Sequence, residues 1–207
     1  MKAAFALLVD TTVHNFMRRL AVDINERYRT GFKAAVLPPH ISLKQPFQIS
    51  GLAAVEAYFD QLAQSVEPFE ITLTHLELQV VSLDDGEQGV LWLAVREDHA
   101  LRSLHRRINL ELAERFENTQ APFDGPAYRF HATLAVGGQP VDVYRRIYAE
   151  YGPVQANLTY TARELAMYYM EDDSHAAEGF VYKMLPLGKG EGTDKSQVSG
   201  LRLTALT

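Results

Sequence analysis

Two short stretches of this sequence place a histidine two residues before a hydroxyl side chain: His40 precedes Ser42, and His131 precedes Thr133. Both stretches are rich in strand-forming residues, and in a β-strand the side chains of residues i and i+2 point to the same face. Each histidine is therefore expected to stand beside its hydroxyl on one face of a strand. Two imidazoles and two hydroxyls on open sheet faces are suited to acid–base chemistry on a phosphate.

Cleavage of a phosphodiester without a metal ion needs one group that takes a proton from the attacking oxygen and one that gives a proton to the departing oxygen. Imidazole has an ordinary pKa of about 6.5, so one neutral and one protonated histidine can fill these roles near neutral pH. The nonbridging phosphate oxygens gain negative charge and need fixed hydrogen-bond donors. His40 and His131 are thus the candidate catalytic residues, and Ser42 and Thr133 are the candidate phosphate-binding residues.

The repetition of the motif is a modest signal by itself, because the chain has seven histidines. Two features strengthen it: a leucine follows each hydroxyl residue, and both copies fall at equivalent points of a repeated pattern of expected elements. Two alternatives stay open. The histidines could be buried and bonded to their neighbouring hydroxyls, or they could form a metal site, although no His-x-His or His-x-x-x-His spacing is present.

The repeated pattern is a strand–helix–strand unit whose second strand carries the motif, predicted from hydrophobic periodicity. The first unit comprises a strand over residues 3–9, a helix over 11–28 and a strand that starts at His40 and ends at Pro46. The second comprises a strand over residues 89–95, a helix over 99–116 and a strand over 128–136. Two related lobes that face each other across a cleft would bring both motif faces into the same space.

The fold class expected is α+β, with duplicated lobes, largely antiparallel sheets facing each other across a central cleft, and helices outside. The other expected elements are helices over 52–65 and 141–151, strands over 69–81, 158–170 and 179–185, a turn at 84–86 and a hairpin connection at 170–175. A bilobed domain is expected over residues 1–187, with one lobe at roughly 1–82 mixed with 137–187 and the other at 83–136. Residues 188–207 are typical of a flexible linker and C-terminal tail.

Composition restricts the function classes. The chain has 207 residues, 47% of them hydrophobic and 22% charged, which is ordinary for a globular protein. Its net charge of −6 argues against an extended nucleic-acid footprint, though not against an RNA end in a local cleft. The absence of cysteine suits a cytoplasmic location. The apolar start ends at Asp10 without a cleavage site, and no stretch reaches the length of a membrane span, so neither a signal peptide nor a membrane partner is expected.

The paired motifs in a duplicated α+β frame resemble those of the two-histidine (2H) phosphoesterase superfamily. Its members include the LigT-like 2′-5′ RNA ligases and the 2′,3′-cyclic nucleotide phosphodiesterases. The resemblance covers roughly residues 1–187 and rests on a pair of HxTx-type motifs, with serine in place of threonine at position 42. The context of the first motif is similar to that of bacterial members: His40-Ile41-Ser42-Leu43-Lys44-Gln45-Pro46-Phe47.

This resemblance implies a hydrolase without a metal or cofactor, acting on 2′,3′-cyclic phosphates or 2′-5′ linkages of nucleotides or RNA ends, as in RNA processing. It implies that His131 activates water and His40 protonates the leaving oxygen, while Ser42 and Thr133 bind the phosphate. The alternative is a non-catalytic binder of RNA or nucleotide terminal phosphates that uses the same cleft. The physiological substrate, hydrolysis versus ligation, and the oligomeric state stay open.

Four further residues are weaker candidates for substrate binding. Lys44 has the strand parity of His40, and Arg129 has that of His131, so either could offer a positive charge to a phosphate or lie solvated at an edge. Phe5 and Tyr168 (or Tyr169) could stack on a base, although each also suits the core. The remaining histidines are expected to be surface or otherwise satisfied residues: His14, His75, His99, His105 and His175.

Overall fold

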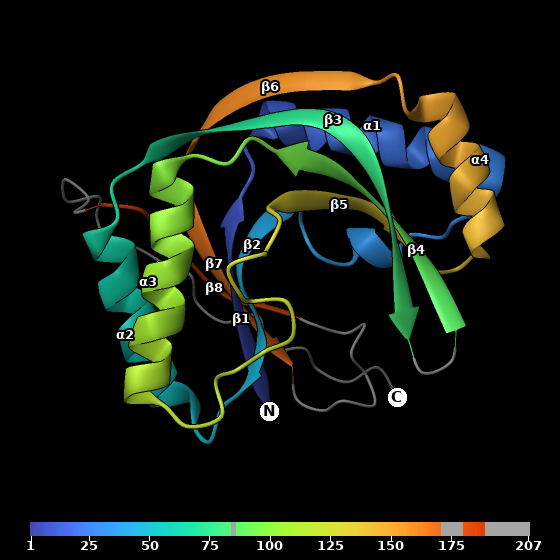
Figure 1. Ribbon diagram of the computed structural model, residues 1–207. Helices are drawn as coiled ribbons and strands as arrows, with labels where there is room; N and C mark the ends of the chain where they lie inside the picture. The colour runs from blue at the N-terminus through green and yellow to red at the C-terminus, as the bar shows by residue number, and fades with distance from the viewer. Residues whose placement is uncertain (84–85, 171–179, 189–207) are drawn as a thin grey trace, which may run out of the picture.

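Two four-stranded antiparallel sheets form the frame of the molecule (Figure 1). The computed structural model describes residues 1–83, 86–170 and 180–188. The first sheet has the order β2-β1-β7-β8 and the second β5-β4-β3-β6. The strands of the first sheet are β1 (Lys2–Leu8), β2 (His40–Gln48), β7 (Glu164–Met170) and β8 (Phe180–Pro186). Those of the second are β3 (Phe69–Leu83), β4 (Gly86–Val95), β5 (His131–Val136) and β6 (Gln155–Ala162).

Four α-helices lie outside the sheets within the described part of the chain, as the α+β prediction requires. They are α1 (Thr11–Tyr28), α2 (Leu52–Ser65), α3 (His99–Arg115) and α4 (Val141–Tyr151), and a 3₁₀ turn, η1 (Lys33–Ala35), precedes β2. The helices of the two repeated units begin alike. Asp10 accepts a hydrogen bond from the Val13 N–H at the start of α1, and Asp98 accepts one from Leu101 at the start of α3.

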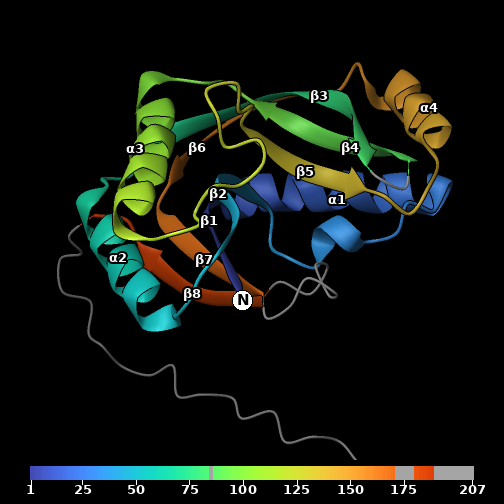
Figure 2. The same ribbon diagram turned by 60° about the horizontal axis from the view of Figure 1, so that its bottom comes forward.

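The helices of the two repeated units are exchanged between the sheets. Helix α1, which follows β1, packs against β5 of the second sheet and against α4. Helix α3, which follows β4, packs against β2 of the first sheet. Both views show α3 beside α2 at one end of the molecule and α1 beside α4 at the other (Figures 1 and 2). The two sheets and their helices share one large hydrophobic core, and a smaller cluster of buried residues lies on the other face of the first sheet.

Sequence periodicity missed a break between two strands. The stretch expected as a single strand over residues 158–170 is two strands in different sheets, β6 and β7, separated at Arg163. Strand β3 lies within the first predicted lobe, yet it pairs with β4 and β6 of the second sheet. The two sheets therefore do not follow the predicted lobes, 1–82 with 137–187 and 83–136. The expected turn at 84–86, the hairpin connection at 170–175 and the tail at 188–207 lie largely outside the described residues.

Strand β2 continues through Pro46 to Gln48, beyond the predicted end at the proline. Proline cannot donate a ladder hydrogen bond, but β2 is an edge strand of its sheet and one of its sides has no ladder to complete. Among the described residues, no helix combines the length and the apolar character needed to cross a membrane.

Candidate functional site

The first motif stands on one face of β2. Strand register places His40 opposite Leu8 and Ser42 opposite Ala6 on β1. Directly opposed residues of an antiparallel pair project to the same side, so the histidine and the hydroxyl share the face formed by the alternate residues of β1. The intervening Ile41 is fully buried on the other face. The side chains of His40 and Ser42 are half-buried, whereas Ala6 opposite the serine is buried.

The second motif repeats this arrangement on β5. His131 lies opposite Ala94, and Thr133 lies opposite Trp92 on β4. The intervening Ala132 is fully buried, whereas His131 and Thr133 are half-buried. Both motifs therefore present a histidine and a hydroxyl on one sheet face, backed by the core.

A β-bulge follows the hydroxyl residue in both motifs. On β2 the register shifts so that Ser42 faces Ala6 while Lys44 faces Phe5, leaving Leu43 as the extra residue. On β5 Thr133 faces Trp92 while Ala135 faces Leu91, leaving Leu134 as the extra residue. A bulge inverts the parity of the residues beyond it. In each motif the residue that follows this leucine, Lys44 on β2 and Ala135 on β5, therefore points into the core.

The two motif strands meet. Strands β2 and β5 are edge strands of their own sheets and lie in contact with each other. The imidazoles are close enough for the charge of His131 to lower the pKa of His40. The structure thus brings together the four residues that the sequence singled out for catalysis and phosphate binding.

Each imidazole is held by a backbone carbonyl two residues earlier in the chain. Nδ1 of His40 lies 2.8 Å from the carbonyl oxygen of Pro38, and Nδ1 of His131 lies 2.7 Å from that of Arg129. A carbonyl only accepts hydrogen bonds, so Nδ1 carries a proton in both rings. Nε2 is therefore the nitrogen that can take or give a proton in each.

Both imidazoles are shifted toward the neutral form. Burial lowers the pKa of His40 below its ordinary value of 6.5, the hydrogen bond to Pro38 opposes this effect, and the charge of His131 lowers the pKa further. Burial likewise lowers the pKa of His131, opposed by the hydrogen bond to the Arg129 carbonyl. The Arg129 guanidinium adds to the lowering, and the Glu77 carboxylate counteracts it. An anion between the rings would favour the protonated form of either one.

A polar cluster on β3 and β4 supports His131. The Trp92 indole stacks on the imidazole, with ring centroids 4.1 Å apart and planes 21° from parallel. Its Nε1 donates to Glu77 at 3.0 Å, and the same carboxylate pairs with Arg129 and with Nε2 of His75. Arg129 is 59% exposed, so its guanidinium is held beside the site while most of it faces solvent. Of the two charged candidates from the sequence, Arg129 is the one that lies at the site.

Lys44 is instead a buried structural residue, and the parity argument that placed it beside His40 was wrong because of the bulge. Its side chain is 2% exposed; Nζ lies 2.6 Å from Asp124 Oδ2 and donates to Asn109 at 2.7 Å. Asp124 also accepts a hydrogen bond from the Gln45 backbone N–H at 3.1 Å. These contacts tie β2 to the loop that leads into β5.

A second tie between the motif strands runs through Tyr128. Its hydroxyl donates to the Ser42 carbonyl at 3.2 Å, and its ring stacks on His105 with centroids 4.8 Å apart. Burial raises the pKa of Tyr128 to about 12, so the hydroxyl stays protonated and able to donate. His105 was expected at the surface but is 3% exposed, enclosed by Tyr128 and Phe130.

The two aromatic candidates differ. Phe5 is fully buried in the core against Phe47 and Phe59, on the face opposite the motif, so its proposed stacking on a base was wrong. Tyr168 lies on the motif side of the first sheet, opposite Ala4, with its ring centroid 5.0 Å from that of His40. Tyr168 is only 2% exposed. It therefore packs against the imidazole and does not form an open platform for a base.

Sequence reasoning missed Trp92, Glu77 and Tyr128. The strands that carry Glu77 and Trp92 were predictable, but the cross-strand register that sets Trp92 beside Thr133 and Glu77 beside Trp92 was not. Tyr128 was expected at the start of a strand but lies in the loop before β5. The available signal was weak: a lone tryptophan within an apolar strand. Among the described residues, no group of three His, Asp or Glu side chains is placed to hold a metal ion.

Comparison with known proteins places this geometry in context. The sequence profile of the 2′-5′ RNA ligase superfamily matches residues 9–174. No curated protein matches the chain by sequence. A Thermus thermophilus protein of known structure has a TM-score of 0.60 at 16% identity, covering 92% of this chain and 100% of its own. Escherichia coli LigT complexed with 3′-AMP has a TM-score of 0.55, and the same protein with NADP⁺ has 0.53, each at 16% identity and covering 91% of this chain and 98% of its own.

Proposed function

The chain belongs to the 2′-5′ RNA ligase superfamily, and on this basis we propose that it is a phosphodiesterase that hydrolyses 2′,3′-cyclic phosphates or 2′-5′ linkages at the ends of nucleotides or RNA. The observation that supports this most is the pair of half-buried imidazoles on adjoining edge strands. Each has Nδ1 fixed by a carbonyl and Nε2 available for proton transfer. E. coli LigT has been solved with 3′-AMP, ATP and NADP⁺, which supports a nucleotide ligand here as well.

The proposed reaction needs only groups that the chain supplies. Nε2 of one neutral imidazole accepts a proton from water as the water oxygen bonds to phosphorus. The bond from phosphorus to the 2′ or 3′ oxygen breaks, and the protonated Nε2 of the other imidazole donates to that oxygen. The hydroxyls of Ser42 and Thr133 donate to the nonbridging oxygens as negative charge develops there. Following the family, we assign His131 as the base and His40 as the acid.

The second candidate is a binder of terminal phosphates that does not turn over its ligand. The same hydroxyls and the exposed Arg129 would hold the phosphate in that case. The matched support of both histidines by backbone carbonyls favours the enzyme, because phosphate binding alone does not require two imidazoles with defined tautomers.

An assay with a panel of 2′,3′-cyclic mononucleotides, 2′-5′ dinucleotides and cyclic-phosphate-ended RNA tests the proposal. We expect at least one class to be hydrolysed at the same rate with and without EDTA, since no step requires a metal ion. Addition of an RNA strand with a free 5′-hydroxyl tests ligation in the same experiment. Saturable binding without product would favour the binder, and activity abolished by EDTA would refute the two-histidine mechanism.

The pH dependence of hydrolysis follows from the lowered histidine pKa values. In the free protein the acid must be protonated, and burial together with the second imidazole disfavours that state, so we expect the alkaline limb of kcat/KM to lie below pH 6.5. A bound phosphate anion favours the protonated ring, so the alkaline limb of kcat should lie at higher pH. Initial rates measured over about pH 5–8 separate the two limbs. Coinciding limbs would contradict this account of the site.

A further inference from the structure

Trp92 connects the carboxylate of Glu77 to the face of the His131 imidazole. The indole and imidazole rings lie nearly parallel, 21° apart, with centroids separated by 4.1 Å. The indole Nε1–H donates to Glu77 Oε2 at 3.0 Å. The register places Glu77 of β3 opposite Trp92 of β4, and Trp92 opposite Thr133 of β5. The array Glu77–Trp92–His131 thus spans three adjacent strands of the second sheet.

The array acts on the face of the imidazole because its edge is already occupied. Nδ1 of His131 is bonded to the Arg129 carbonyl, so no carboxylate bonds to the ring there, unlike in the catalytic triads of serine proteases. The face of an indole attracts a cation more strongly than that of any other aromatic side chain. A hydrogen bond from the indole N–H to a carboxylate polarises the ring further in this direction. The array therefore favours a positively charged imidazole.

The charged and titratable groups around His131 act in different directions. Burial lowers the pKa of His131 most, the hydrogen bond to the Arg129 carbonyl raises it, the Arg129 guanidinium lowers it and the Glu77 carboxylate raises it. Arg129 also pairs with that carboxylate, so Glu77 offsets its positive charge. Nε2 of His75 lies 3.0 Å from the other carboxylate oxygen. The Tyr128 ring lies 6.2 Å from the imidazole, and burial raises the pKa of its hydroxyl to about 12, so it stays neutral.

The imidazole of the first motif lacks such an array. Its aromatic neighbour, Tyr168, meets His40 at an angle of 63°, with ring centroids 5.0 Å apart. Burial lowers the pKa of His40, the Pro38 carbonyl raises it and the charge of His131 lowers it; no carboxylate among the described residues contributes. These surroundings suit a ring that gives up its proton, whereas those of His131 suit a ring that takes one.

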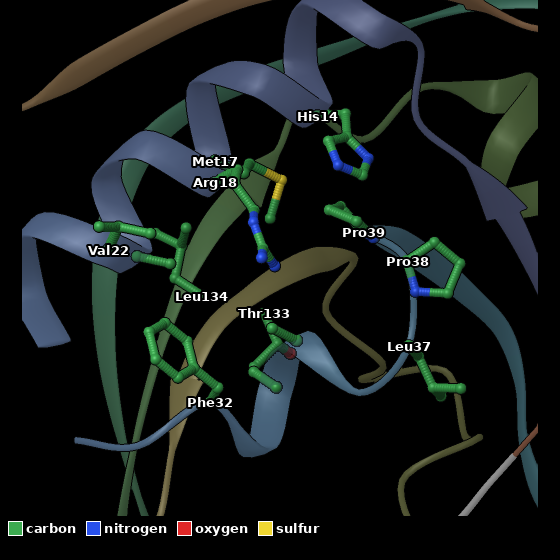
Figure 3. Close-up of a pocket in the computed structure, with 13 residues that line it drawn as sticks. His14, Met17, Arg18, Val22, Phe32, Leu37, Pro38, Pro39, Thr133 and Leu134 are labelled. Atoms are coloured by element: carbon green, nitrogen blue, oxygen red, sulfur yellow. The ribbon is translucent and has the colours of Figure 1, made fainter.

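The hydroxyl of the second motif has the opposite surroundings to its histidine. Thr133 lines a cavity of about 70 Å³ between α1 and residues 32–39 (Figure 3). The other polar side chains there, His14 and Arg18, are basic, and the Arg18 guanidinium extends toward Thr133. No acidic side chain of the described residues lines this cavity. Basic groups suit a hydroxyl that donates to a phosphate anion, whereas a carboxylate suits an imidazole that becomes a cation.

We propose that Glu77 and Trp92 are positioning residues for His131, which stabilise its imidazolium as the ring takes a proton from water. The inference rests on the proposed function and gives a structural reason for assigning His131 as the base. The O–H bond of water breaks as the oxygen bonds to phosphorus, and the proton goes to Nε2. The positive charge that forms lies against the indole face, while Glu77 keeps its own charge and takes no proton.

The first test is kinetic and uses Glu77→Gln, which removes the charge but keeps an oxygen for the indole N–H. We expect kcat for a 2′,3′-cyclic nucleotide to fall about 3–30-fold. KM should not rise, because the phosphate-binding hydroxyls are unchanged. The matched control is Glu70→Gln, which removes an exposed carboxylate near the start of the same strand and should leave both constants at their wild-type values.

The second test follows the histidine ring protons by NMR over a range of pH and needs no substrate. The His131 signal is identified by its loss in His131→Ala. In Glu77→Gln its midpoint should lie at lower pH than in the wild type, because the carboxylate favours the protonated ring, and that of His40 should not fall. Trp92→Phe keeps an aromatic face but has no N–H for the carboxylate, so it should shift the midpoint the same way. The shifts should be less than additive in the double variant.

The outcomes separate this inference from the proposed function. A His131 midpoint that stays or rises in Glu77→Gln, in a protein whose thermal melt is that of the wild type, overturns the array even though hydrolysis stands. Additive shifts in the double variant overturn the role of Trp92, because the carboxylate then acts without the indole. If the midpoint falls as expected but the wild type hydrolyses no substrate, the array stands and the catalytic proposal fails.

Discussion

Replacement of either His40 or His131 by alanine is expected to reduce kcat/KM for a 2′,3′-cyclic nucleotide by about 10²–10⁴-fold. Each imidazole performs one of the two proton transfers in the proposed reaction. Each is also held in place by its own backbone carbonyl, so the remaining histidine is not positioned to perform both transfers. The variant with both histidines replaced should be little worse than either single variant, because groups that act in one step are not additive. Steady-state assays at a fixed pH measure all three.

Two controls distinguish lost chemistry from lost structure. Asparagine at position 40 or 131 can keep a donor toward the carbonyl but cannot transfer the proton, so the activity should fall as far as with alanine while the melting temperature stays close to that of the wild type. His99→Ala removes an exposed histidine from the start of α3 and should leave turnover unchanged. Undiminished hydrolysis in either site variant would refute the two-histidine assignment.

Breaking the ion pair between Lys44 and Asp124 is expected to cost about 3–5 kcal/mol of unfolding free energy. The side chains are 2% and 7% exposed, so either single replacement, Lys44→Met or Asp124→Ala, leaves a charge without its partner in a site shielded from water. Urea unfolding followed by circular dichroism measures the change. The matched control is Asp142→Ala, which breaks a pair whose side chains are 60% and 85% exposed and should cost less than about 0.5 kcal/mol.

The double variant Lys44→Met, Asp124→Leu separates burial from pairing. Because no unpaired charge remains, it should recover much of the stability lost in the single variants. Activity should nevertheless stay reduced, since Asp124 also holds the Gln45 backbone and with it the loop that leads to His131. Single variants as stable as the wild type would show that this pair is not a structural tie between the motif strands.

Sequence patterning was sufficient for most of the elements and for the strand faces on which the two motifs lie. Period-two alternation sets His40 with Ser42 and His131 with Thr133 on common faces, and the antiparallel register confirms that placement for each strand. The same rule failed two residues later for Lys44, because an inserted residue in the strand reverses the alternation and nothing in the local sequence announces it.

Contacts between segments that are far apart in the chain could not be predicted from the sequence. The stacking of Trp92 on His131 depends on which residues of β4 and β5 face each other. The burial of His105 depends on a loop folding back over α3 to bring Tyr128 against it. Residues 158–170 looked continuous because strand-forming residues occur on both sides of Arg163, although the chain changes sheets there.

The exchange of helices between the sheets has a consequence for how the protein can move. Swinging the two sheets apart about a hinge would have to strip α1 from β5 and α3 from β2, exposing buried side chains such as Met17 and Ile108 to water. That cost makes a rigid-body opening of the molecule unfavourable. We therefore expect ligands to enter and leave by rearrangement of surface loops, while the spacing of the two imidazoles stays constant throughout turnover.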